Sequence, residues 1–145
     1  MYRNSPLESM MKASTLEIIK NYYDSFNDQN LNHFLNLLDE NVIHDINQSK
    51  TEIGKAAFSE FMESAYFHYK EKVTDLIIIA NEDGSVAAAK FVVEGTYLNT
   101  AEELPKAKGQ FYRLACGAFF TVKNQKITQV TNYYNLQDWL RQVSE

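Results

Sequence analysis

The chain is short of the residues that mark several classes of protein. It has one cysteine, so an internal disulfide is excluded, and its two prolines and five glycines argue against a low-complexity or collagen-like chain. Basic residues number 14 against 19 acidic ones. We therefore expect no nucleic-acid partner, because phosphate binding needs clustered Lys and Arg. The longest apolar run, residues 76–80, is far shorter than the roughly 20 residues that span a bilayer, so no membrane partner is expected.

The residues that are present fit one globular domain. Hydrophobic residues make up 45% of the 145 positions and charged residues 23%, which suits a single buried core. Residues 1–13 are polar with little periodicity, and we predict a flexible arm there, followed by one domain over residues 14–145. The arm lacks the apolar segment of a secretion signal, and the lone cysteine agrees with a reducing compartment, so we expect a cytoplasmic location.

Four segments have the spacing of amphipathic helices. A capping box at residues 14–17 predicts the start of a first helix that ends at the polar run 27–30, with Phe26 on its apolar face. Asn30 is predicted to cap a shorter second helix. Gly54 opens a third helix with Phe61 on its apolar side, and a fourth helix closes the chain at residues 136–143.

Strand patterns occupy the stretches between and after these helices. A short strand is predicted at residues 41–47, and four longer ones at 73–80, 86–97, 109–123 and 126–134. The pair Asn124-Gln125 is predicted to form a hairpin turn, and the polar loop 98–108 to form a lip. Helices grouped ahead of an antiparallel sheet predict an α+β fold with the helices on one sheet face.

Three stretches, residues 18–31, 38–61 and 91–140, give the chain a resemblance to a known family. In the last stretch the relevant segments are 91–97, 126–128 and 135–140. They resemble the NTF2-like superfamily, in particular its ketosteroid-isomerase and SnoaL-like polyketide-cyclase branches. The resemblance implies a cystatin-like curved antiparallel sheet wrapped around a long N-terminal helix, a conical apolar cavity, and a homodimer formed through the open sheet face.

The resemblance also suggests catalytic residues. In ketosteroid isomerases a first-helix Tyr donates to the enolate oxygen and an Asp transfers the proton. The Tyr position falls on Tyr22, and the base position falls on Ile46 without a gap or on Asp45 with a one-residue gap. If Asp45 points outward, strand alternation turns His44 inward, and His44 becomes the better acid or base. The alternative interpretation is that these residues only pack in the core or face solvent.

Two carboxylates of the family are replaced in this chain. The late-strand Asp of the isomerases falls on Ala118, and the last-strand Asp of the cyclases falls on Asn135. An amide cannot accept a proton at neutral pH, and Asn135 is also well placed to cap the last helix. Further side chains on strands and helices are predicted to contact a ligand: Phe26, Phe61, Glu94, Tyr112, Asn132 and Tyr134.

The sequence therefore predicts a protein that binds a small hydrophobic, carbonyl-bearing molecule. It contains no metal-ligand spacing, phosphate-binding loop or dinucleotide motif, so we expect no cofactor. The leading hypothesis is an isomerase or cyclase that moves a proton next to the carbonyl, with catalytic residues Tyr22 and either His44 or Asp45. The alternative is a ligand-binding or protein-interaction domain of the same fold without catalysis.

Overall fold

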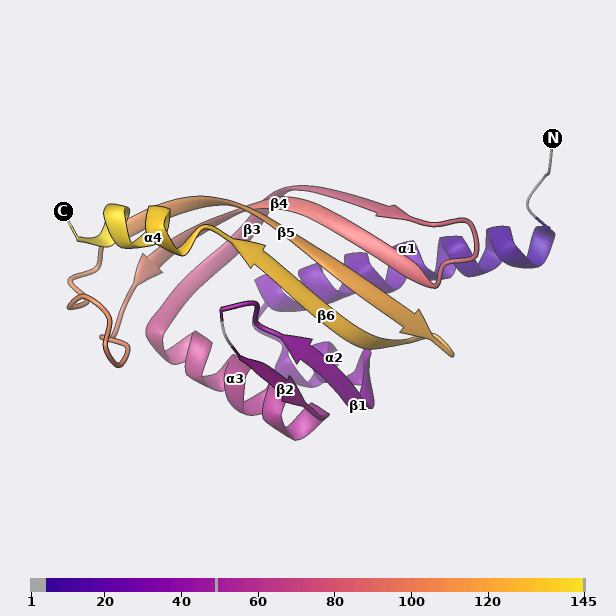
Figure 1. Cartoon of the computed structure of the whole chain (residues 1–145), viewed down its shortest axis with the longest axis horizontal. Helices are drawn as coiled ribbons and strands as arrows, with labels where there is room; N and C mark the ends of the chain where they lie inside the picture. The colour runs from indigo at the N-terminus through magenta and orange to yellow at the C-terminus, as the bar shows by residue number, and fades with distance from the viewer. Residues whose placement is uncertain (1–4, 49, 145) are drawn as a thin grey trace.

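A curved sheet arches over a long helix in the computed structural model of the chain (Figure 1), which describes residues 5–48 and 50–144. Two further helices lie below the same side of the sheet, and a short helix lies at the C-terminal end. The elements follow one another as α1 (Pro6–Asn27), α2 (Leu31–Asn36), β1 (Leu38–Asp45), β2 (Thr51–Ile53), α3 (Lys55–His68), β3 (Tyr69–Ala80), β4 (Val86–Tyr97), β5 (Phe111–Lys123), β6 (Lys126–Tyr134) and α4 (Leu136–Val143).

The six strands form one sheet in the order β2-β1-β6-β5-β4-β3. Strands β3 to β6 form an antiparallel meander, and β1 joins it by pairing in parallel with β6. The predicted hairpin between β5 and β6 is confirmed: Asn124 and Gln125 have φ angles of 52° and 61°, as a tight turn between twisted strands requires. The predicted α+β fold with a curved sheet is confirmed, and the β1–β6 pair is its parallel exception.

The first helix begins earlier than predicted. Ser5 caps it by accepting a 3.0 Å hydrogen bond from the backbone N–H of Glu8, and Pro6 occupies the first turn, where its missing N–H costs nothing. Thr15 then donates a 2.6 Å hydrogen bond to the carbonyl of Gly84, in the turn between β3 and β4. The prediction of an arm over residues 1–13 is therefore wrong for 6–13, and residues 1–4 lie outside the described part of the chain.

The boundary between α3 and β3 also differs from the prediction. The strand was predicted to start at residue 73, but β3 begins at Tyr69, which pairs with Tyr97 of β4. The long β4 supplies backbone partners along its whole length, so β3 extends back to meet them rather than starting at Val73. Strand β1 likewise begins at Leu38, before the predicted start at residue 41, and the short β2 was not predicted.

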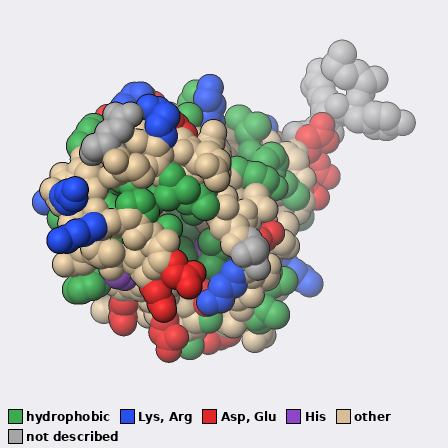
Figure 2. Space-filling view, turned by 60° about the vertical axis from the view of Figure 1, so that its left-hand side comes forward, with side chains coloured by type: hydrophobic (Ala, Val, Ile, Leu, Met, Phe, Trp, Pro, Cys, Tyr) green, Lys and Arg blue, Asp and Glu red, His purple; other side chains and the backbone are tan. Residues whose placement is uncertain are grey.

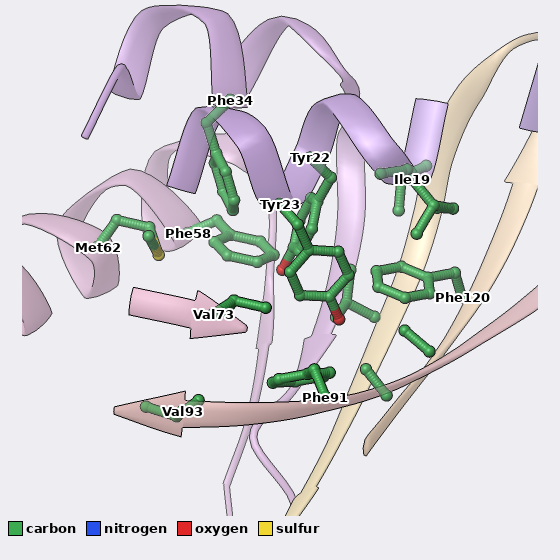
Figure 3. Close-up of a cluster of buried hydrophobic side chains, with 14 of the residues drawn as sticks. Ile19, Tyr22, Tyr23, Phe34, Phe58, Met62, Val73, Phe91, Val93 and Phe120 are labelled. Atoms are coloured by element: carbon green, nitrogen blue, oxygen red, sulfur yellow. The ribbon is translucent and has the colours of Figure 1, made fainter. Parts of the chain in front are cut away.

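The core lies between the inner face of the sheet and helices α1, α2 and α3 (Figure 3). Aromatic rings fill much of it: the ring of Tyr22 lies 4.5 Å from that of Phe34 and 5.2 Å from that of Phe120. Strand β4 alternates buried and less buried residues along its length, so one face of the sheet meets this core. Among the described residues, no helix is long and apolar enough to cross a membrane.

Candidate functional site

A cavity of about 320 Å³ lies on the inner side of the sheet, beside the aromatic core. Its wall combines side chains from α1, β1, α3, α4 and the four long strands, and most of them are apolar. Leu104 adds a contribution from the loop between β4 and β5, the loop that was predicted to form a lip. Figure 2 brings the α4 end of the molecule forward and shows hydrophobic side chains gathered around a hollow in the surface.

His44 is a polar group in this apolar wall. Strand β1 turns its side chain inward, where it is 1% exposed, and its ring stacks on Phe58 with 3.9 Å between centroids. Its Nε2 atom lies 3.4 Å from Nδ2 of Asn132, which also lines the cavity. Burial lowers the pKa of His44 to about 4 because a charged imidazolium would be poorly solvated there, so the ring is neutral at neutral pH.

Glu52 faces the other nitrogen of this ring. It lies opposite His44 on β2, and its Oε1 atom is 3.9 Å from Nδ1 of His44. Both atoms are buried without a hydrogen-bond partner among the described residues, so a small approach would join them. In the tautomer with the proton on Nδ1, Nε2 accepts from the Asn132 amide and Nδ1 is the nitrogen nearer this carboxylate. Glu52 is thus placed to favour this tautomer and to orient the ring.

Asp45 points away from the cavity, as strand alternation requires once His44 faces inward. Its carboxylate accepts a 3.0 Å hydrogen bond from the backbone N–H of Asn47, and the Thr51 hydroxyl lies 3.5 Å from the same oxygen. Asp45 does not line the cavity. The sequence left open which of the two residues faces inward. The structure places His44 inside and Asp45 at the outward-facing end of β1, where its carboxylate accepts a hydrogen bond from one backbone N–H.

Tyr22 lies in the cavity wall on α1, next to Tyr23, with 5.0 Å between the ring centroids. Burial raises the pKa of Tyr22 well above its ordinary value, so the hydroxyl keeps its proton and remains a hydrogen-bond donor. The hydroxyl of Tyr23 is buried without a hydrogen-bond partner among residues 5–48 and 50–144. Two tyrosines of α1 therefore line the same cavity as His44.

Four of the six predicted ligand contacts line the cavity, namely Phe26, Phe61, Asn132 and Tyr134. The other two lie elsewhere. Glu94 is on the outer face of β4, where its carboxylate is 3.5 Å from Nε of Arg113. Tyr112 is 1% exposed beneath the wall, and its hydroxyl donates a 2.5 Å hydrogen bond to Glu71.

Glu71 lines the cavity and was not a candidate in the sequence. Burial raises the pKa of its carboxyl, and the hydrogen bond from Tyr112 opposes that rise. The sequence signal that could have identified Glu71 is that Tyr69, Glu71 and Val73 alternate along one strand face. The predicted strand began at Val73, so Glu71 was never assigned to a face.

The two residues that stand in place of the family's carboxylates, Ala118 and Asn135, have structural roles in this chain. Ala118 is fully buried on the inner face of β5, paired with Asn132 of β6. Asn135 caps α4 by accepting a 3.0 Å hydrogen bond from the backbone N–H of Asp138, which confirms the predicted cap. Among the described residues, no group of three His, Cys, Asp or Glu side chains is placed to hold a metal ion.

The long helix under a curved sheet, with a cavity between them, is the NTF2-like fold. The chain belongs to the SnoaL-like domain family, whose model matches residues 19–130. A protein from Burkholderia xenovorans described as NTF2-like shares the fold with a TM-score of 0.74, at 14% identity over 91% of this chain and 97% of that one.

Two solved structures are much more similar in sequence, and both are of proteins proposed to be polyketide cyclases. The protein from Pseudomonas putida KT2440 is 50% identical over 89% of this chain and 97% of that one, with a TM-score of 0.88. The protein from Xanthomonas campestris pv. campestris is 43% identical over 92% and 98%, with a TM-score of 0.89. No curated protein matches the chain.

Proposed function

We propose that this protein binds a small hydrophobic ketone in the cavity and catalyses proton transfer at the carbon next to the carbonyl, without a cofactor. The observation that carries the proposal is His44, a neutral imidazole that faces an otherwise largely apolar cavity beside Asn132. An isomerisation or a ring closure of the polyketide-cyclase type both start with this step. The two similar proteins proposed to be polyketide cyclases support the same reaction class.

In the proposed reaction His44 acts as the general base. When the ketone binds, its oxygen takes the Asn132 N–H from Nε2, and the freed Nε2 lone pair removes a proton from the α-carbon. The C–H electron pair moves into the C–C bond, and the carbonyl becomes an enolate. The Tyr22 hydroxyl and the Asn132 amide are the donors proposed to stabilise the enolate oxygen, in a largely apolar cavity. The imidazolium then returns a proton to carbon: at the same atom this completes a hydrogen exchange, and at a conjugated atom it completes an isomerisation.

The test is proton exchange on 2-tetralone, a small ketone with acidic α-hydrogens, followed by NMR in D₂O. Wild type is expected to speed the exchange, and His44→Gln to reduce the protein-dependent rate by at least about 100-fold, as expected for loss of a general base. His33→Gln, which changes an exposed histidine on α2, is the matched control and is expected to keep the wild-type rate. Equal rates in wild type and His44→Gln would refute the proposed catalysis.

A non-catalytic binding or interaction domain is the second candidate. Ala118 and Asn135 favour it, because they stand where the resemblance implies catalytic carboxylates and both have structural roles instead. This candidate predicts that 2-tetralone binds, as measured by calorimetry, but that no protein-dependent exchange occurs.

We also propose that the protein is a homodimer formed through the outer sheet face. Apolar side chains follow one another there across the strands: Ile79 of β3 is 64% exposed and Phe119 of β5 is 54% exposed, with Ala88 of β4 paired between them. Tyr133 of β6 packs edge-on against Phe119 with 5.9 Å between ring centroids. A continuous apolar surface of this kind favours a partner, and a second copy offers a matching one.

A further inference from the structure

Glu71 stands out as a carboxyl group in the apolar wall of the cavity, on a different strand from His44. Its Oε2 atom accepts the 2.5 Å hydrogen bond from the hydroxyl of Tyr112. No Lys, Arg or His of residues 5–48 and 50–144 forms an ion pair with it, and Tyr112 is its one hydrogen-bond partner in that part of the chain. A carboxylate has about four acceptor positions, so most of its capacity to accept hydrogen bonds is unused.

The neighbouring strand is built to hold Glu71 in this position. Gly95 of β4 pairs with Glu71 on one side and with Tyr112 of β5 on the other. A Cβ atom at Gly95 would come within 2.4 Å of the Tyr112 ring, so the glycine leaves the space through which this ring reaches across β4. Tyr112 is almost fully buried, which leaves its ring little room to move elsewhere. The pair is therefore a fixed feature of the wall.

Leaving a carboxyl group in an apolar wall is unfavourable unless it is paired. Burial raises the pKa of Glu71, which reflects this cost, and a cation that would offset it is not found among the described residues. A hydroxyl group suits the free acceptor positions, because it donates one hydrogen bond, as the Tyr112 hydroxyl already does.

We propose that Glu71, held by Tyr112, is a specificity-determining subsite that accepts a hydrogen bond from a hydroxyl group of the ligand. The inference rests on the cavity being the ligand site of the proposed function, and it names the ligand class more closely. The ligand is a cyclic ketone with its α-carbon at His44 and a hydroxyl on another ring atom. Phe26, Phe91 and Trp139 add aromatic surface to the cavity wall for the apolar ring atoms to contact.

The experiment compares the affinity of wild type for 2-tetralone with that for its 5-, 6- and 7-hydroxy derivatives and the matching methoxy ethers, by calorimetry. At least one hydroxy derivative is expected to bind about tenfold or more tightly than 2-tetralone, as a charge-assisted hydrogen bond allows. Its methoxy ether, which cannot donate, is expected to show no such gain. Absence of any hydroxyl preference in wild type, including absence of binding by every probe, would overturn the proposal.

Variants test whether the preference for the hydroxy derivatives depends on Glu71. Glu71→Met is expected to abolish the hydroxyl preference and Glu71→Gln to reduce it, while Glu63→Met, at an exposed carboxylate on α3, is expected to retain it. Preserved preference in a folded Glu71→Met protein would also overturn the proposal. If Glu71→Met does not fold, the carboxyl ¹³C resonance of Glu71 in wild type decides: it is expected to shift with the hydroxy probe and not with the ether, and equal shifts would contradict the subsite.

The result is separable from the proposed reaction. Proton exchange depends on His44, whereas the hydroxyl preference is a ratio of binding constants that depends on Glu71. A protein that shows the preference without exchange would keep the subsite and reject the catalysis. A protein that shows exchange without the preference would keep the catalysis and reject the subsite.

Discussion

His44 carries the largest consequence of any one residue, because its burial as a neutral ring links stability to pH. Its pKa is about 4 in the folded chain, below the value of 6.5 for an exposed histidine. As the pH falls from 6.5 toward 4, the unfolded chain takes up a proton that the folded chain does not. The contribution of His44 is therefore fully present above pH 6.5 and is lost across this window, to a total of about 3 kcal/mol.

The corresponding measurement is urea unfolding of wild type and His44→Gln at pH 7 and pH 4.5. Other groups also titrate in this range, so the expected result is a difference between the two proteins. Wild type should lose about 2–3 kcal/mol more stability than the variant on acidification. The same pH dependence in both proteins would show that His44 does not titrate in the way its burial requires.

The sequence identified some residues of the cavity wall and missed others. The family resemblance suggested Asp45 as the base and strand alternation added His44, but which of the two faces inward depended on how β1 pairs with β6, a contact between distant parts of the chain. Glu94 was chosen because a carboxylate in an apolar strand is unusual, yet an ion pair with Arg113 on the outer face explains it. Glu71 was missed because the position of a strand start is set by its partner strand.

At the scale of elements, the end of α1 is fixed to the sheet by a single side chain. Asn27 donates a 3.0 Å hydrogen bond to the carbonyl of Val73 and accepts a 2.8 Å hydrogen bond from its backbone N–H. This attachment lies just before the irregular pairing of β3 with β4 between Thr74 and Ile77, where Asp75 has a φ angle of 53°. Helix and strand are thus joined where the strand bends.

Asn27→Ala is expected to lower the free energy of unfolding by about 1–3 kcal/mol, because it leaves a partly buried backbone N–H and carbonyl unpaired. Asn32→Ala, at an exposed position of α2, is the control and is expected to change stability much less. Urea unfolding measures both, and hydrogen exchange at the Val73 amide is expected to quicken only in Asn27→Ala. Equal effects of the two changes would mean that the attachment contributes nothing.

The presence of each helix and long strand was predicted better than the residues at which it starts and ends. The two strands with clear alternation and a tight turn, β4 and β6, have the predicted limits, 86–97 and 126–134. Helix α1 extends beyond its predicted start because Thr15 and Gly84, far apart in sequence, hold its first half against a turn. Such contacts leave no local pattern in the chain, which is why the capping box at residues 14–17 was a plausible but incorrect start.

At the scale of the whole molecule, the proposed dimer gives the clearest test. Phe119→Glu places a charge in the middle of the outer sheet face and is expected to convert a dimer to a monomer, as measured by sedimentation velocity. Phe67→Glu is the matched control, because Phe67 is 61% exposed but lies at the end of α3 and not on the sheet. It is expected to leave the oligomeric state unchanged. A monomeric wild type, or a dimeric Phe119→Glu protein, would refute the proposed interface.

The parallel pairing of β1 with β6 has a consequence for the order in which the molecule assembles. His44 and Asn132 are 88 positions apart, and they meet only when the last strand pairs with the first. During synthesis the first two-thirds of the chain can form α1, α3 and the β3–β4 pair, but not the wall that brings these two side chains together. Long-range pairing of this kind is slow to form, so the site is expected to close in one of the last steps of folding.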